Sequence, residues 1–153
     1  MLEWMILPFK RYADFKGRSR RKEFWSFALL NLIVYAVLFA IVMGTGASMA
    51  SLASADPNNP FAIYASLFSG TGIILAIWWL AVLVPTIAVT VRRLHDRDMS
   101  GWWYLGFFIA AFIPIVGFVS GIALLVLMLL PGTPGPNRFG PDPKDPTSAE
   151  VFA

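Results

Sequence analysis

The sequence predicts an all-α membrane protein: a polytopic transmembrane helical bundle of about four spans, with an N-terminal interfacial segment and a Pro/Gly-rich C-terminal tail. Two observations predict this class. Of the 153 residues, 58% are hydrophobic and only 14% are charged, whereas a soluble domain is about 45–50% apolar and about 25% charged. The charged residues are also clustered, and they leave three long uncharged stretches at 24–55, 57–91 and 99–137.

The uncharged stretches contain enough apolar residues for several membrane crossings, each of which needs about 20 residues to pass about 30 Å of hydrocarbon. The apolar part of the third stretch would be about 43 Å long as a helix, which is long for one crossing and short for two. Because Pro114 and Gly117 lie at its middle and break helices, we predict a hairpin there. One long kinked helix, and hence three spans, is the alternative. The predicted spans are 24–44, 67–91, 102–115 and 117–130, in a single membrane domain of residues 1–143 followed by a flexible tail at 144–153.

The first 23 residues are predicted to lie at the membrane interface. Trp4, Pro8, Tyr12 and Phe15 recur at helical spacing among basic residues, which is typical of an amphipathic helix in the headgroup layer. Gly17 is expected to end this segment before the first span.

The basic residues predict the orientation, because Lys and Arg are kept on the cytoplasmic side of a membrane. Four spans place all twelve basic residues on one side, whereas three spans leave Arg138 and Lys144 on the other. Both counts put the N-terminus in the cytoplasm. The apolar run at 24–44 is longer than the core of about 7–15 residues in a cleaved signal peptide, so we expect this span to be retained in a multi-pass protein.

Three blocks of residues carry a resemblance to a known family. The first is Tyr-Ala-Asp-Phe (12–15) with Gly-Arg (17–18) and Arg-Lys-Glu-Phe-Trp (21–25), and the second is Arg-Arg-Leu-His-Asp (92–96) with Ser-Gly-Trp-Trp (100–103). The third is Pro-Gly (131–132) with Gly-Pro-Asn-Arg-Phe-Gly (135–140) and Pro-Asp-Pro (141–143). Over about residues 4–143 the sequence resembles the domain-of-unknown-function 805 family of small bacterial inner-membrane proteins. The resemblance implies a location in the bacterial inner membrane and a helical membrane fold, but no activity.

Residues that could carry chemistry are few. The chain has no cysteine and one histidine, which excludes disulfides, thiolate metal sites and multi-histidine metal sites. No catalytic spacing is present, so we predict no catalytic residue, no metal and no cofactor. The predicted spans contain no ionisable residue, which argues against an ion-coupled transporter.

The basic residues are the candidate binding residues. They adjoin apolar spans, so anionic lipid headgroups are the nearest phosphates, and we expect no nucleic acid as a partner. Contact with a partner protein is the other interpretation, and the small residues Gly117 and Gly121 leave self-association open. The candidate lipid- or partner-binding residues are Arg18, Arg20, Arg21, Lys22, Arg92 and Arg93.

We further predict that the three polar blocks form one cap on the cytoplasmic side, because the four-span topology brings them to the same side. The proline-rich tail is expected to be ordered to about Pro143 through docking on this cap. The residues assigned to the cap are Asp14, Glu23, His95, Asp96, Asn137 and Arg138.

These observations favour a non-enzymatic accessory or interaction component of the inner membrane, with a basic cytoplasmic face. A small transporter or channel-like oligomer is one alternative, and it would require a polar stripe through the spans. A membrane enzyme acting on lipid headgroups is the other, and it would use Asp14, His95, Asp96 and the arginines.

Overall fold

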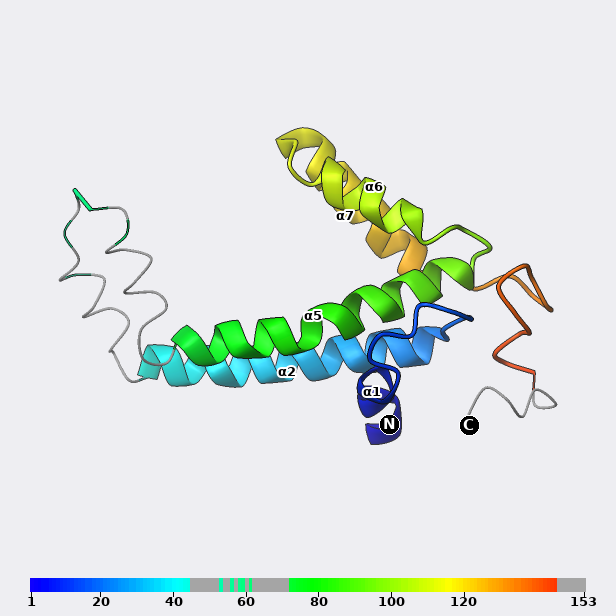
Figure 1. The fold of residues 1–153 in the computed structure, drawn as a ribbon, viewed down its shortest axis with the longest axis horizontal. Helices are drawn as coiled ribbons and strands as arrows, with labels where there is room; N and C mark the ends of the chain where they lie inside the picture. The colour runs from blue at the N-terminus through cyan, green and yellow to red at the C-terminus, as the bar shows by residue number, and fades with distance from the viewer. Residues whose placement is uncertain (45–52, 54–55, 57, 60, 62–71, 146–153) are drawn as a thin grey trace. The chain divides into compact units, whose positions relative to one another are not determined.

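The computed structural model of the protein is helical (Figure 1). The structure describes residues 1–44, 53, 56, 58–59, 61 and 72–145, and these described residues contain five helices and no strand. The helices are α1 (Leu2–Lys10), α2 (Arg21–Gly44), α5 (Gly72–His95), α6 (Trp102–Ala110) and α7 (Pro114–Leu129).

The chain divides into two compact units. One unit comprises Met1–Ala28 and Val84–Ala153, and the other comprises Leu29–Leu83. The first unit contains α1, α6, α7 and all three polar blocks. In the second unit, α2 and α5 line an open apolar groove of about 820 Å³.

Helices α2 and α5 are long and apolar enough to cross a membrane. Only 11% and 22% of their most apolar windows are buried inside the protein, whereas the core helix of a soluble protein is mostly buried. Such outward-facing apolar side chains suit a lipid environment. Helices α6 and α7 have nine and sixteen residues, fewer than the about 20 that a crossing needs, so the predicted count of four crossings is not confirmed.

Helix α1 covers only the first part of the predicted interfacial segment, because it ends at Lys10. Within α1, the side chains of Met5 and Pro8 are buried. The ring of Phe9 packs edge-on against Phe27 of α2, with the two ring centroids 5.4 Å apart. The N-terminal helix is thus attached to the beginning of α2 through apolar side chains.

The end of α5 differs from the prediction. The second predicted span ends at residue 91, but α5 continues to His95. Asp98 N donates to His95 O and Met99 N to Leu94 O, both at 3.0 Å, and Asp98 has φ 58°, which together form a Schellman motif. The helix can extend past its apolar run because basic side chains in the last turn suit the negative end of the helix dipole.

The break between α6 and α7 falls before Pro114 and not after it as predicted. Proline is favoured at the first position of a helix, where no N–H is needed, and it moves the preceding residue out of the helical region. Ile113 accordingly has φ −101° and ψ 114°. Gly117 lies inside α7, where a Cβ would come within 2.7 Å of the carbonyl oxygen of Ala111, so this glycine permits the tight hairpin.

Candidate functional site

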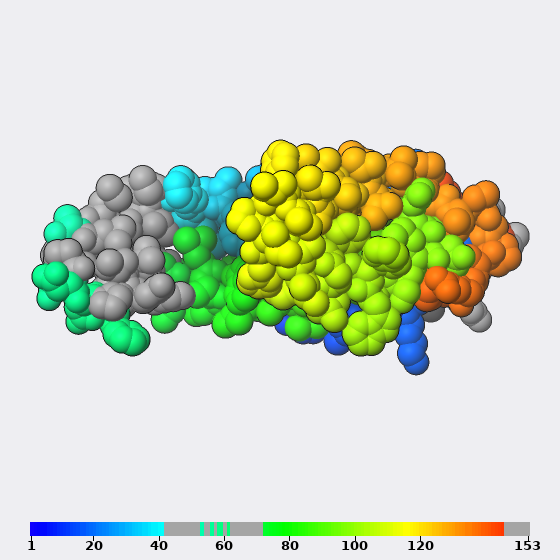
Figure 2. All heavy atoms as spheres, turned by 90° about the horizontal axis from the view of Figure 1, so that it is seen from above, coloured from blue at the N-terminus to red at the C-terminus, as the bar shows by residue number. Residues whose placement is uncertain are grey.

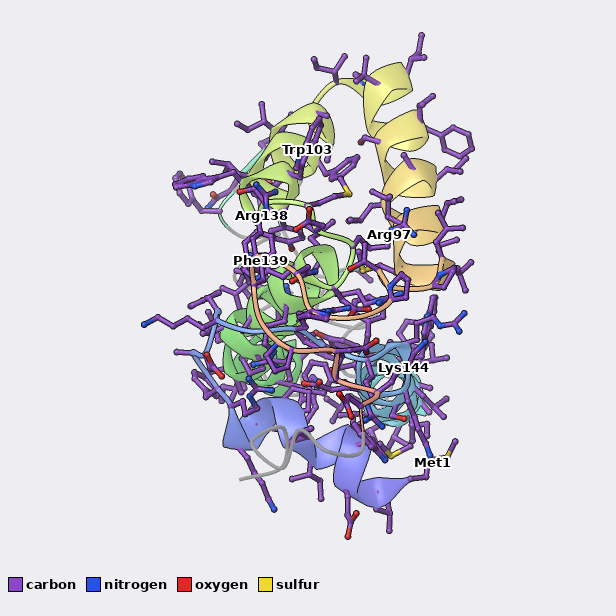
Figure 3. All side chains as sticks on the ribbon, turned by 90° about the vertical axis from the view of Figure 1, so that its right-hand side faces the viewer. Met1, Arg97, Trp103, Arg138, Phe139 and Lys144 are labelled. Carbon is purple, nitrogen blue, oxygen red and sulfur yellow. The ribbon has the colours of Figure 1, made fainter. Side chains whose placement is uncertain are left out.

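A polar cap forms where the beginning of α2, the end of α5 and the tail meet. We define the polar cap as residues 14–23, 92–98 and 131–143, all of which belong to the first unit. Figure 3 shows the trace of the tail, which carries Arg138 and Phe139, passing over the end of α5. The cap therefore joins segments that are far apart in the sequence.

Asp96 lies at the centre of the polar cap. Its Oδ1 accepts a hydrogen bond from Arg18 Nε at 3.0 Å, and its Oδ2 accepts one from Arg93 Nη1. All three side chains are at most 5% exposed. One buried carboxylate thus serves two buried guanidinium groups, an arrangement that is favourable only when the remaining N–H groups also find acceptors.

A second buried pair joins the first turn of α2 to the last turn of α5. Glu23 Oε1 accepts from Arg92 Nη2 at 2.7 Å, and Glu23 Oε2 accepts from Ser19 Oγ at 2.8 Å. Arg92 Nη1 also donates to the carbonyl oxygen of Asp14 at 2.7 Å. Ser19, which lies just before α2, thus orients the glutamate for the arginine.

His95 connects all three segments of the polar cap. Its Nδ1 lies 3.1 Å from the carbonyl oxygen of Gly17, and because a carbonyl only accepts, Nδ1 carries the proton. The imidazole stacks on Phe139 with centroids 3.9 Å apart and planes at 4°, and Asn137 Nδ2 donates to His95 O at 2.9 Å. This histidine is buried and holds the tail in place.

The tail is held by hydrogen bonds although it has no regular structure. Thr133 N donates to Asp96 O at 2.8 Å, and Arg18 donates to the carbonyl oxygens of Thr133 and Gly135, each at 2.6 Å. A Cβ on Gly132 would overlap the carboxylate of Asp96, so the tail can approach this closely only with glycine at that position. Of the predicted flexible tail at 144–153, residues 146–153 lie outside the described residues.

The C-terminus of α7 also ends at the polar cap. The last carbonyls of a helix have no partner inside it, and here three arginines supply partners. Arg21, Arg93 and Arg97 donate to the carbonyl oxygens of residues 129, 130 and 131, the first at 3.2 Å and the last at 2.7 Å. The base of the α6–α7 hairpin is therefore anchored at the level of the cap.

Two carboxylates at the edge of the polar cap have lowered pKa values. Partial burial raises the pKa of Asp14, but hydrogen bonds from Arg11 at 2.7 Å and from the backbone of Lys16 at 3.0 Å outweigh it, so the pKa lies below its ordinary value. The backbone N–H of Lys144 is the main cause of the lowered pKa of Asp142. Both groups are ionised at neutral pH.

The structure brings together residues from all three predicted blocks. Three of the predicted binding residues, Arg18, Arg92 and Arg93, are buried and paired with carboxylates of the chain, so their guanidinium groups face the protein interior. Arg138 is exposed and forms a salt bridge with Asp98 at 3.2 Å. Every residue that the sequence assigned to the cap lies within the segments of the polar cap. These residues are Asp14, Glu23, His95, Asp96, Asn137 and Arg138.

The other predicted binding residues lie at the surface, next to α1. Arg21 and Lys22 are exposed and Arg20 is half-buried. Arg20 and Lys22 both lie over the ring of Trp4, at 5.8 and 5.7 Å from its centroid. The outward positive charge of this region is thus concentrated where α1 meets the beginning of α2.

Sequence reasoning missed the backbone acceptors of the polar cap. Gly17, Thr133 and Gly135 contribute carbonyl oxygens, and no sequence signal marks such a role because every residue has a carbonyl. Gly132 belongs to the third block, but its role was missed, since this role comes from the nearby carboxylate of Asp96 and not from a local turn.

The polar cap pairs its charged groups with one another. Asp96 and Glu23 both accept from buried arginines. Over the residues that the structure describes, no group of three or more histidine, aspartate or glutamate side chains could hold a metal ion.

Two long apolar helices and a polar cap of buried arginine–carboxylate pairs define a helical membrane protein whose polar segments fold onto one another. The chain belongs to the family described as protein of unknown function (DUF805), whose model matches residues 12–141. The match includes most of all three blocks that carried the resemblance, which is thereby confirmed.

Three relatives from Escherichia coli strain K12 are similar to the chain. Inner membrane protein YhaH is 38% identical over 143 residues, 94% of this chain and 98% of the relative. Inner membrane protein YhaI is 35% identical over 143 residues, 94% of this chain and 97% of the relative. Uncharacterized protein YiiR is 30% identical over 150 residues, 86% of this chain and 87% of the relative. No solved structure matches the chain.

Proposed function

We propose that the protein is a non-enzymatic component of the bacterial inner membrane that holds anionic lipid headgroups against a basic cytoplasmic surface. The observation that carries this proposal is the contrast between Arg18, Arg92 and Arg93 and the three basic residues next to α1, which are Arg20, Arg21 and Lys22. One set is buried and neutralised inside the polar cap. The other set faces outward beside α1.

The membrane location is supported by the two apolar helices and by the names of the relatives YhaH and YhaI. The cytoplasmic orientation is supported by the basic residues, which favour that side. Helices α2 and α5 cross the membrane, so the chain returns to its original side. Both termini then lie in the cytoplasm whether α6 and α7 cross the membrane twice, as in the four-span prediction, or only enter it and return.

The outward set is arranged as a lipid-contacting surface would be. Leu2 is 73% exposed and Ile6 is 48% exposed on α1, so apolar side chains can enter the interface beside the charges. Trp4 lies under Arg20 and Lys22, and tryptophan favours the membrane interface. Each basic residue near an anionic surface contributes about 1 kcal/mol.

The proposal is tested with the full-length protein in lipid nanodiscs that contain both neutral and anionic lipids, by measuring which lipids remain bound on extraction. We expect enrichment of anionic lipid, and loss of that enrichment in Arg21→Gln/Lys22→Gln. At about 1 M salt, where the Debye length is about 3 Å, the enrichment should fall in the parent as well.

The single variant Lys22→Gln is measured as well, and its matched control is Lys144→Gln, which removes an exposed lysine from the tail. Equal lipid retention in the parent and in Arg21→Gln/Lys22→Gln would overturn the lipid proposal. An equal loss in Lys22→Gln and Lys144→Gln would show a general effect of net charge and would also overturn it. Co-purification of a protein that is lost in Arg21→Gln/Lys22→Gln, with unchanged lipid, would favour a protein partner instead.

The orientation is tested separately. The chain has no cysteine, so single cysteines can be placed at Asn59 and Lys144 without removing others. A membrane-impermeant maleimide should label Asn59→Cys in whole cells and Lys144→Cys only in inverted vesicles. Labelling of both from the same side would refute the proposed topology.

A further inference from the structure

The α6–α7 hairpin is apolar except for two hydroxyl groups, those of Tyr104 in α6 and Ser120 in α7. Residues 105–119 contain no polar side chain, and the side chains of Phe112, Ile115 and Phe118 are 75%, 81% and 72% exposed. Met128 is the buried side chain of α7, and α6 contains none. Figure 2 shows one face of the hairpin uncovered. A helix that is apolar all round belongs in a protein core or in lipid.

The length of the hairpin limits how deeply it can enter a membrane. The nine residues of α6 rise about 13.5 Å and the sixteen residues of α7 about 24 Å, at about 1.5 Å per residue. The hydrocarbon layer is about 30 Å thick. Because neither arm is as long as the layer is thick, the turn of the hairpin lies inside the layer.

The base of the hairpin is at the polar cap. Arginines of the cap donate to the carbonyl oxygens of residues 129–131. At the other arm, a Cβ on Gly101 would overlap Val91, so α6 begins directly against the end of α5. Trp102 and Trp103 follow and are exposed, as suits residues at a membrane interface. Both arms therefore enter the membrane from the side on which the cap lies.

The turn of the hairpin is built for surroundings without water. Ala111 N, Phe112 N and Ile113 N donate to carbonyl oxygens of α6 at 3.0, 3.2 and 3.1 Å, and Pro114 has no N–H to satisfy. Ser120 Oγ donates to Gly117 O at 2.9 Å. A turn that reached the water on the opposite side of the membrane could hydrogen-bond to that water and would not need these hydrogen bonds within the hairpin. Such a turn would also be expected to contain polar side chains.

We infer that α6–α7 is a re-entrant hairpin that enters the lipid acyl chains from the side of the polar cap and turns back inside them, so that α2 and α5 alone cross the membrane. Acyl chains fit as the occupant because the apolar surface surrounds both helices, whereas a partner helix would need only one apolar stripe. This inference holds for either orientation of the cap and does not depend on the lipid headgroups that the exposed arginines and lysines contact.

The test uses single cysteines at Phe112 and Ile115 in the full-length protein in its native membrane. Both side chains are strongly exposed, so neither substitution removes core packing. We expect an impermeant maleimide to label neither site in whole cells or in inverted vesicles. A nitroxide attached at either site should be relaxed by oxygen and not by a water-soluble nickel complex, at a depth inside the hydrocarbon layer.

The controls are cysteines at Asn59 and Lys144, which report the two water-filled sides. Labelling of Phe112→Cys or Ile115→Cys from the side that labels Asn59→Cys would mean two complete crossings and would overturn the inference. Labelling of either from the side that labels Lys144→Cys would mean a hairpin outside the bilayer and would also overturn it, as would a nitroxide depth at the far headgroups. If the parent protein shows no enrichment of anionic lipid while Phe112→Cys and Ile115→Cys stay unlabelled, the proposed function fails and the hairpin inference stands.

Discussion

Replacement of Asp96 by asparagine should destabilise the polar cap more than any other change of a single charge in it. The aspartate accepts from Arg18 Nε at 3.0 Å and from Arg93 Nη1, and both arginine side chains are at most 1% exposed. Asp96→Asn removes the negative charge and turns an amide N–H₂ group toward one guanidinium. Two buried positive charges then keep carbonyl partners only.

The size of this effect follows from the burial. Removing one partner of a buried pair costs about 3–5 kcal/mol, because the remaining charge stays in a poorly hydrated site. At about 2–4 °C per kcal/mol for a chain of this size, the melting temperature should fall by roughly 6–20 °C. The assays are thermal melting in detergent and the rate of tryptic cleavage after Arg138, which reports release of the tail.

Asp98→Asn is the matched control. Asp98 is two residues away, carries the same charge, and forms an exposed salt bridge with Arg138 at 3.2 Å, which contributes about 0–1 kcal/mol. Asparagine also tolerates the positive φ of 58° at this position. A melting temperature for Asp96→Asn within about 2 °C of Asp98→Asn, with tail cleavage unchanged in both, would refute the buried-pair reasoning.

Three further predictions concern the cap and the hairpin. Gly132→Ala should lower the melting temperature, because the new Cβ would overlap the carboxylate of Asp96. Gly121→Ala should leave the melting temperature nearly unchanged, since nothing described lies within 4 Å of that position. Equal melting temperatures for the two variants would contradict this prediction. Asp98→Ala should be less stable than Asp98→Gly by about 1–2 kcal/mol, because the left-handed conformation of residue 98 disfavours alanine. Chemical denaturation measures the free energy of unfolding of both variants, and equal values would contradict the prediction. The lowered pKa of Asp14 stabilises the folded state above the ordinary aspartate pKa of about 3.9, and this stabilisation is lost as the pH falls through the lower folded value. Between pH 3 and pH 7 the melting temperature of Asp14→Asn should therefore depend less on pH than that of the parent. Identical profiles of melting temperature against pH would argue against a lowered pKa.

Much of the helical pattern follows from local sequence. The apolar runs predict α2, α5 and the hairpin, because a helix satisfies its own backbone and needs only apolar side chains to enter lipid. The ends of the helices were less predictable. Arg92 and Arg93 fall outside the second predicted span because they are charged, yet they continue α5, since Glu23 and Asp96 neutralise them.

The candidate site depends more on long-range contacts. The predicted four-span topology would bring the three polar blocks to one side, but it does not say which arginine faces inward. Arg18 is 78 residues from Asp96 in the chain, and neither residue differs by type from its charged neighbours. The choice between Arg18, which is buried, and Arg21, which is exposed, comes from the direction that the backbone takes after Gly17.

The sequence alone determined that this is a helical membrane protein, that its charges gather in three blocks, and to which family it belongs. These properties can be read from the sequence because each depends only on residue types and on their spacing along the chain. Only the tertiary structure decided which arginines pair with Asp96 and Glu23, and that α6 and α7 have nine and sixteen residues. Pairing depends on the burial and direction of side chains from distant segments, and the length of the arms depends on where Pro114 allows α7 to begin.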